Sequence, residues 1–66
     1  MKEYWANAIY VDSNGKAQRL FTTDSMSYEE CYKTIKVWQQ DFKICFWYIT
    51  DTAMNIVDYA NLVSLN

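Results

Sequence analysis

The chain has 66 residues and a formal net charge of −2, with six Lys and Arg against eight Asp and Glu, and it contains no His and no Pro. A chain of this length forms one domain, here residues 1–66, and buries only about 60% of the surface that its unfolded form exposes. Its slightly acidic charge lacks the basic patch of a nucleic-acid-binding protein, and no apolar run reaches the roughly 18 residues of a membrane span.

The first third of the chain predicts two strands joined by a tight turn. Residues that favour β structure flank the sequence DSNGK, in which Asn14-Gly15 supplies the positive φ angles of a hairpin turn. A two-residue type I′ turn and a type I turn with Gly15 in a bulge are both compatible with this sequence. The two turns differ by one residue in register, so that Ile9 faces either Leu20 or Arg19.

A helix over residues 28–41 is predicted next. Ser27-x-x-Glu30 matches a capping box at the start of this segment. The apolar side chains that follow recur at spacings of three and four residues, which indicates an amphipathic helix with one covered face. The apolar stripe consists of Tyr28, Cys31, Tyr32, Ile35, Trp38 and Phe42.

A second hairpin follows, with strands over residues 44–50 and 56–59. In its loop, Asp51 can accept hydrogen bonds from its own turn and Asn55 tolerates the left-handed conformation. The tail at residues 60–66 either prolongs the last strand or forms a helical turn, and we expect an extended continuation.

These elements predict an α+β domain of ββαββ order. A right-handed crossover through the helix places strand 1 between strands 2 and 3, which gives a four-stranded antiparallel sheet of order 2-1-3-4 with one helix on one face. The edge strands then fall in the segments AQRLFTT and NIVDY, whose charged and hydroxyl side chains suit an edge.

The run ICFWYI in strand 3 leaves one sheet face to be explained. Alternate residues of a strand point to opposite faces, so large side chains lie on both. We expect Cys45, Trp47 and Ile49 beneath the helix, because Cys45 is small, and Phe46 and Tyr48 opposite, where the hydroxyl of Tyr48 suits a wetter surface. The helix-free face has a flat area on the order of 350 Å², a size that commonly marks an interface.

No catalytic, cofactor or metal site is predicted. Without His, Cys31 and Cys45 have no general base, and two thiolates leave a zinc tetrahedron half empty. A single Gly excludes phosphate-cradling loops. We expect both cysteines to be buried free thiols; the alternatives are a disulfide or redox pair, or an acid/base site that pairs Asp58 with another carboxylate.

We therefore expect a non-enzymatic protein-interaction module without cofactor or metal. The first residues lack the apolar core of a secretory signal, so a cytoplasmic setting is expected. Its size suits a regulator, adaptor or inhibitor of the kind that phages and mobile elements encode. The partner would be a second copy of the chain and also a protein target, bound through an aromatic sheet face. The expected interface residues are Tyr4, Tyr10, Phe21, Phe46, Tyr48 and Tyr59.

The alternative function is the binding of single-stranded nucleic acid through aromatic residues of the sheet, since exposed bases stack on aromatic sheets. The residues considered for this stacking are Tyr4, Tyr10, Phe21, Trp47 and Tyr59. AIYVDSNGKAQRLFTT followed by SYEECYKTIK resembles the hairpin and helix of the small arm-binding domains of phage-type integrases. That resemblance implies DNA binding. The acidic balance and the second hairpin depart from it, so no family is assigned and nucleic acid is not the expected partner.

Overall fold

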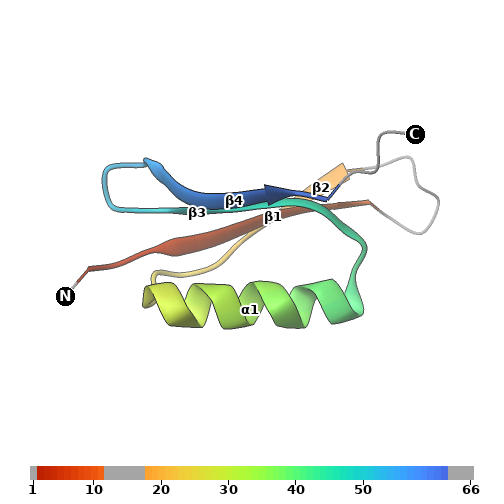
Figure 1. The fold of residues 1–66 in the computed structure, drawn as a ribbon, viewed down its shortest axis with the longest axis horizontal. Coiled ribbons are helices and arrows are strands. Elements are labelled where there is room, and N and C mark those ends of the chain that lie inside the picture. The colour runs from red at the N-terminus through yellow and green to blue at the C-terminus, as the bar shows by residue number, and fades with distance from the viewer. Residues whose placement is uncertain (1, 12–17, 63–66) are drawn as a thin grey trace.

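The computed structural model describes residues 2–11 and 18–62. Its four strands form one antiparallel sheet of order β2-β1-β3-β4, and the helix packs on one face of that sheet (Figure 1). This arrangement confirms the predicted α+β fold and strand order. The elements are β1 (Trp5–Val11), β2 (Gln18–Thr22), α1 (Tyr28–Asp41), β3 (Ile44–Thr50) and β4 (Ile56–Asn61). The predicted turn at residues 12–16 and the tail beyond Leu62 lie outside the described residues.

The helix begins and ends where the sequence predicts. The hydroxyl oxygen of Ser27, the N-cap, accepts a hydrogen bond from the backbone N–H of Glu30 at 3.2 Å. The same hydroxyl donates to the Glu30 carboxylate at 3.2 Å, so the two residues form the expected pair at the helix start. Cys31 and Ile35 are its buried residues. The described residues contain no helix long and apolar enough to cross a membrane.

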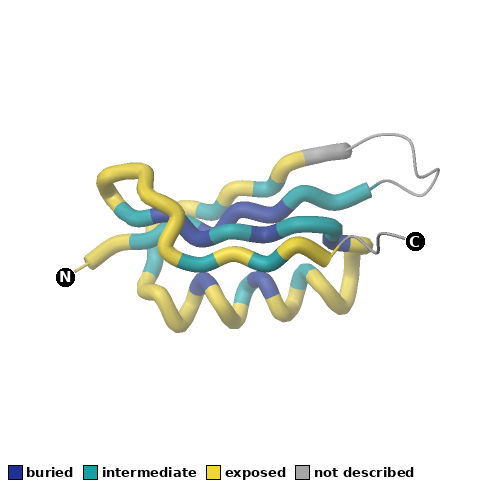
Figure 2. The backbone as a smooth tube through the Cα atoms, turned by 45° about the horizontal axis from the view of Figure 1, so that its top comes forward, coloured by how far each residue is buried: buried dark blue, intermediate teal, exposed yellow. Residues whose placement is uncertain are grey.

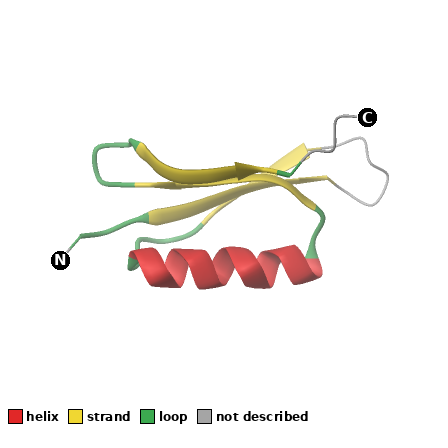
Figure 3. Cartoon of the chain, in the orientation of Figure 1, coloured by secondary structure: helices red, strands yellow, loops and turns green. Residues whose placement is uncertain are grey.

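The helix lies over the two central strands, β1 and β3 (Figures 1 and 3). Beneath it, the sheet has small and large side chains in alternation. Ala8 of β1 is fully buried between Phe21 of β2 and Trp47 of β3, and Ala60 of β4 lies beyond Trp47. The small Ala8 leaves room for the helix to approach β1, while the larger neighbours fill the flanks. The central strands accordingly contain the buried sheet residues (Figure 2).

A bulge in β3 changes which residues face the helix. Ile9 pairs with Phe46 but Tyr10 pairs with Ile44, so Cys45 is an extra residue in the β1–β3 ladder. The buried apolar residues of β3 are therefore Ile44, Trp47 and Ile49, which simple alternation cannot place on one face. The prediction is confirmed for Trp47 and Ile49, whereas Cys45, expected to be buried, is only half-buried and donates its S–H to the Ile9 carbonyl at 3.3 Å.

The second hairpin forms around Asp51, as predicted. Its carboxylate accepts hydrogen bonds from the backbone N–H groups of Ala53 and Asn55, at 3.0 and 2.9 Å. The left-handed residue, however, is Met54, with φ of 66°, and not Asn55. Because the loop closes between Asp51 and Asn55, the left-handed residue is the one before the closing position.

Strand β4 is longer than predicted and contains a second bulge. It extends to Asn61 instead of ending at Tyr59, and the N–H of Leu62 donates to the Cys45 carbonyl at 2.8 Å. The described part of the tail is thus extended, as expected. Ile49 pairs with Asp58 but Thr50 pairs with Ile56, so Val57 is the extra residue in this ladder.

Candidate functional site: the helix-free face of the sheet

The face of the sheet opposite α1, here called the open face, can be read from the strand registers. Ile9 pairs with Leu20 and not with Arg19, so the register of the first hairpin is the first of the two predicted alternatives. Because Ala8 faces the helix, its neighbours Asn7 and Ile9 face the other side. Three rows of paired residues therefore cross the open face: Thr22, Asn7, Tyr48 and Tyr59; Leu20, Ile9, Phe46 and Asn61; and Trp5, Thr50 and Ile56.

Three aromatic rings gather on the β3–β4 half of the open face. The Phe46 ring lies with its centroid 5.8 Å from that of Tyr48 and 6.1 Å from that of Tyr59. Tyr59 is 64% exposed, and the aliphatic side chains of Leu20 and Ile56 are each 56% exposed on the same face. These side chains form an apolar surface that is not covered by any of residues 2–11 and 18–62.

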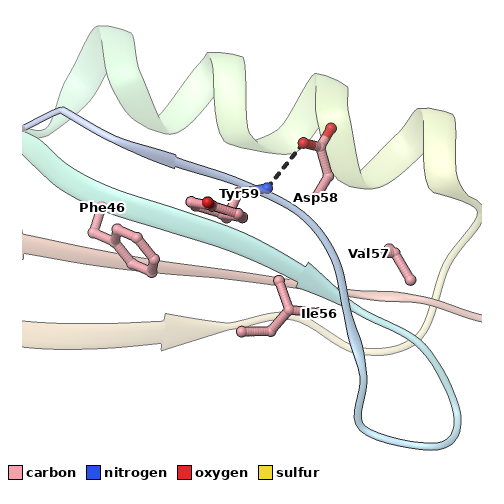
Figure 4. Close-up of a pocket in the computed structure, with 5 residues that line it drawn as sticks. All are labelled: Phe46, Ile56, Val57, Asp58 and Tyr59. Carbon is pink, nitrogen blue, oxygen red and sulfur yellow. Dashed lines mark hydrogen bonds between the residues drawn. The ribbon is translucent and has the colours of Figure 1, made fainter.

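A shallow pocket lies within this surface, beside the edge strand β4. It has a volume of about 380 Å³ and is lined by Phe46, Ile56, Val57, Asp58 and Tyr59. The Asp58 carboxylate turns toward the helix, whereas the Tyr59 ring lies over β3 and β4 (Figure 4). The lining side chains other than Asp58 are apolar or aromatic, so the pocket suits an apolar group.

The centre of the open face is polar but buried. Asn7 is only 6% exposed and Thr50 only 7%. The Asn7 side-chain amide donates to the carbonyls of Trp5 and Tyr48 at 3.2 and 3.4 Å, and to the Thr50 hydroxyl at 3.4 Å. Its carbonyl oxygen accepts from the Thr22 hydroxyl at 3.0 Å. These polar groups are internally satisfied and therefore do not require an external ligand.

The structure brings together half of the predicted interface residues. Phe46, Tyr48 and Tyr59 share the open face, whereas the placement of the others on that face is wrong. Tyr10 stacks on Phe21 with ring centroids 4.5 Å apart. Both rings also contact Phe42 at the end of α1, at 5.3 and 5.0 Å. Tyr4, which was also expected on the open face, instead contacts Tyr28 of the helix, with ring centroids 5.6 Å apart.

The error has a physical cause. The high aromatic content suggested more rings than the space between one helix and the sheet can hold, yet the alanines at positions 6 and 8 leave room for most of them. Leu20 and Ile56, conversely, lie on the open face but are not among the expected interface residues. Leu20 follows from the register with Ile9, while Ile56 follows from the Val57 bulge, which has no signal in the sequence.

One strong polar contact joins the helix to the edge strand. The Tyr28 hydroxyl donates to the Asp58 carboxylate at 2.6 Å, near the start of α1. This hydrogen bond, followed by burial and the negative charge of Asp58, raises the pKa of Tyr28 to about 12. The contact lies on the helix side of β4 and thus apart from the aromatic cluster.

The cysteines and carboxylates of residues 2–11 and 18–62 form neither a disulfide nor a metal-binding cluster. Both thiols are free, which excludes a disulfide between them in this structure. Burial raises the pKa of the Cys31 thiol, with a smaller effect from Glu30, so its reactive thiolate form is suppressed. Within the same residues, no three acidic, Cys or His side chains gather as ligands for a metal ion.

No known protein family, no curated protein and no solved structure matches the chain. The function proposed below therefore rests on the geometry and chemistry of the open face.

Proposed function

We propose that the chain is a small protein-interaction module that pairs with a second copy of itself through the open face. The observation that carries this proposal is the cluster of Phe46, Tyr48 and Tyr59, flanked by the exposed Leu20 and Ile56. Tyrosine and other aromatic residues are enriched at protein interfaces because they combine a large apolar surface with a polar group. In a cell, such a pair would act as an adaptor, regulator or inhibitor.

The character of the open face favours protein over nucleic acid. Its described positions have aromatic, aliphatic, hydroxyl and amide side chains but no Lys or Arg. Proteins that stack single-stranded bases on aromatic rings combine those rings with a positively charged groove along the phosphates. A like surface on a second copy needs no such charge, since two apolar faces stack about 10 Å apart as in a β-sandwich.

The size of the face sets the expected affinity. Four strands span about 19 Å across and seven residues span about 23 Å along, which gives each copy a flat face on the order of 400 Å². The combined area of two such faces is smaller than the roughly 1,600 Å² that a standard stable interface buries. We therefore expect a reversible dimer with a dissociation constant on the order of micromolar, rather than an obligate one.

Sedimentation equilibrium over a concentration series tests this pairing. We expect Tyr59→Lys to convert the dimer to a monomer, because it introduces a charge into the apolar contact of each copy. Val37→Lys is a matched control: Val37 is 54% exposed on the helix, and its substitution adds the same charge away from the open face.

Three outcomes are decisive. A dimer that Tyr59→Lys dissociates and Val37→Lys leaves intact supports the proposal. A folded wild-type chain that stays monomeric at about 100 μM, well above the expected dissociation constant, contradicts it. Salt-sensitive quenching of tryptophan fluorescence by single-stranded oligonucleotides, lost in Tyr59→Lys, would favour nucleic acid as the partner of the open face.

A further inference from the structure

The edge strand β4 has features of a surface that could pair with another strand. It has exposed apolar side chains at Ile56, Val57 and Tyr59, and Leu62 continues them. An edge strand of this kind offers unpaired backbone groups to any other chain that approaches in an extended conformation. A face-to-face pair of copies would leave this edge accessible, so the assembly needs a device that limits it to two chains.

Asp58 occupies the backbone donor at the middle of this edge. Tyr59 pairs with Tyr48 in register, but its N–H donates to the Asp58 carboxylate at 2.9 Å and not to β3 (Figure 4). The other carboxylate oxygen accepts a separate hydrogen bond of 2.6 Å from the Tyr28 hydroxyl. The Asp58 side chain thus accepts hydrogen bonds from the outward N–H of Tyr59 and from Tyr28 of the helix.

We propose that Asp58 closes the β4 edge, so that copies of this chain associate through the open face and do not extend one another's sheets. An approaching strand must offer a carbonyl oxygen to the N–H of Tyr59, where it would meet a carboxylate that already accepts this hydrogen bond. The bulge at Val57 interrupts the ladder directly before this point and reinforces the closure. Without Asp58, the backbone edge of β4 would be free to pair, and the strand that pairs with it would be β4 of another copy.

This inference has two parts. Association through the open face rests on the proposed function, whereas the closure of the β4 edge does not and is tested separately. The test compares the wild-type chain with Asp58→Ala by sedimentation velocity over a concentration series, and monitors intermolecular strand pairing by infrared spectroscopy. We expect the mass of Asp58→Ala to rise continuously with concentration, whereas the wild-type mass reaches a plateau. Adding Val57→Lys to Asp58→Ala should restore the plateau, because a Lys on an edge strand opposes pairing.

Tyr28→Phe is the matched control, because it removes the bond between helix and strand but leaves Asp58 on the Tyr59 N–H. If Tyr28→Phe assembles as far as Asp58→Ala does, loss of stability explains the assembly and the proposal is wrong. The proposal is also wrong if folded Asp58→Ala reaches the wild-type plateau. A monomeric wild type beside an assembling Asp58→Ala supports edge closure and contradicts pairing through the open face.

A measurement on the wild-type chain alone keeps the inference testable even if Asp58→Ala does not fold. The Tyr59 amide lies on an edge strand but is hydrogen-bonded, so its hydrogen exchange should be slower than that of an unstructured peptide of the same sequence. Hydrogen exchange is measured at a protein concentration below the dissociation constant of the dimer, where the chain is monomeric. Exchange of the Tyr59 amide at the unstructured rate would show that Asp58 does not occupy this donor.

Discussion

The left-handed backbone of Met54 predicts a stabilising substitution. Its φ of 66° costs a residue with a Cβ roughly 1–2 kcal/mol, whereas Gly adopts this conformation without steric penalty. Gly also has more conformational freedom in the unfolded chain, which offsets about 0.5–1 kcal/mol of the gain. Met54 is 80% exposed, so little packing is lost. We expect Met54→Gly to raise the free energy of unfolding by about 0.5–1 kcal/mol.

Urea unfolding followed by circular dichroism measures this gain, and thermal unfolding should show a rise in the melting temperature of about 3–6 °C. The protein concentration is held constant, because association also shifts apparent stability. Ala53→Gly is the control in the same loop: Ala53 has no positive φ, so the substitution should reduce stability by about 0.4–1 kcal/mol. Equal effects of the two substitutions would refute the assignment of strain to Met54.

Three further predictions concern the helix side of the sheet. Ala8→Leu should lower the free energy of unfolding by about 1–3 kcal/mol in urea titrations, because Ala8 is fully buried beneath the helix, while Ala60→Leu at the half-buried edge should lower it less. The pKa of Tyr28 is raised above its usual value of 10.0 to about 12, so the stability from its hydrogen bond is present below pH 10.0 and is lost as pH rises toward about 12. Tyr28→Phe should remove this component of the stability-versus-pH curve; an unchanged curve contradicts it. In a thiol-labelling time course, Cys45 should react before unfolding and Cys31 only after it; equal rates in the folded chain would show that Cys31 is accessible.

The elements and their order could be predicted because they depend on local and pairwise rules. The capping residues Ser27 and Glu30 define the helix start through two hydrogen bonds of 3.2 Å. The spacing of apolar residues defines its buried side, and the handedness of the crossover leaves one place for β1 in the sheet. Each of these rules acts on residues close in sequence or on the topology of the chain.

The site could be predicted only in part, because bulges and close packing depend on contacts between distant segments. The extra residues Cys45 and Val57 change the face on which later side chains lie, and no residue type in the sequence marks a bulge at either position. The placement of Tyr10 and Phe21 beneath the end of the helix depends on the space that small residues leave there. The positions of Phe46 and Tyr48 on the open face follow from their alternation with the buried Trp47 and Ile49, and that of Tyr59 from its pairing with Tyr48.

The buried Asn7 side chain has a consequence for how the chain folds. Its amide group connects Thr22 of the first hairpin to Thr50 at the start of the second hairpin's loop. If β1 shifted by one residue against β2, Asn7 would lose its hydrogen bond with Thr22, and if β1 shifted against β3, Asn7 would lose those with Tyr48 and Thr50. Each lost hydrogen bond costs about 0.5–1.5 kcal/mol. One buried side chain thus favours the native alignment of β1 with both of its neighbours, β2 of the same hairpin and β3 of the other.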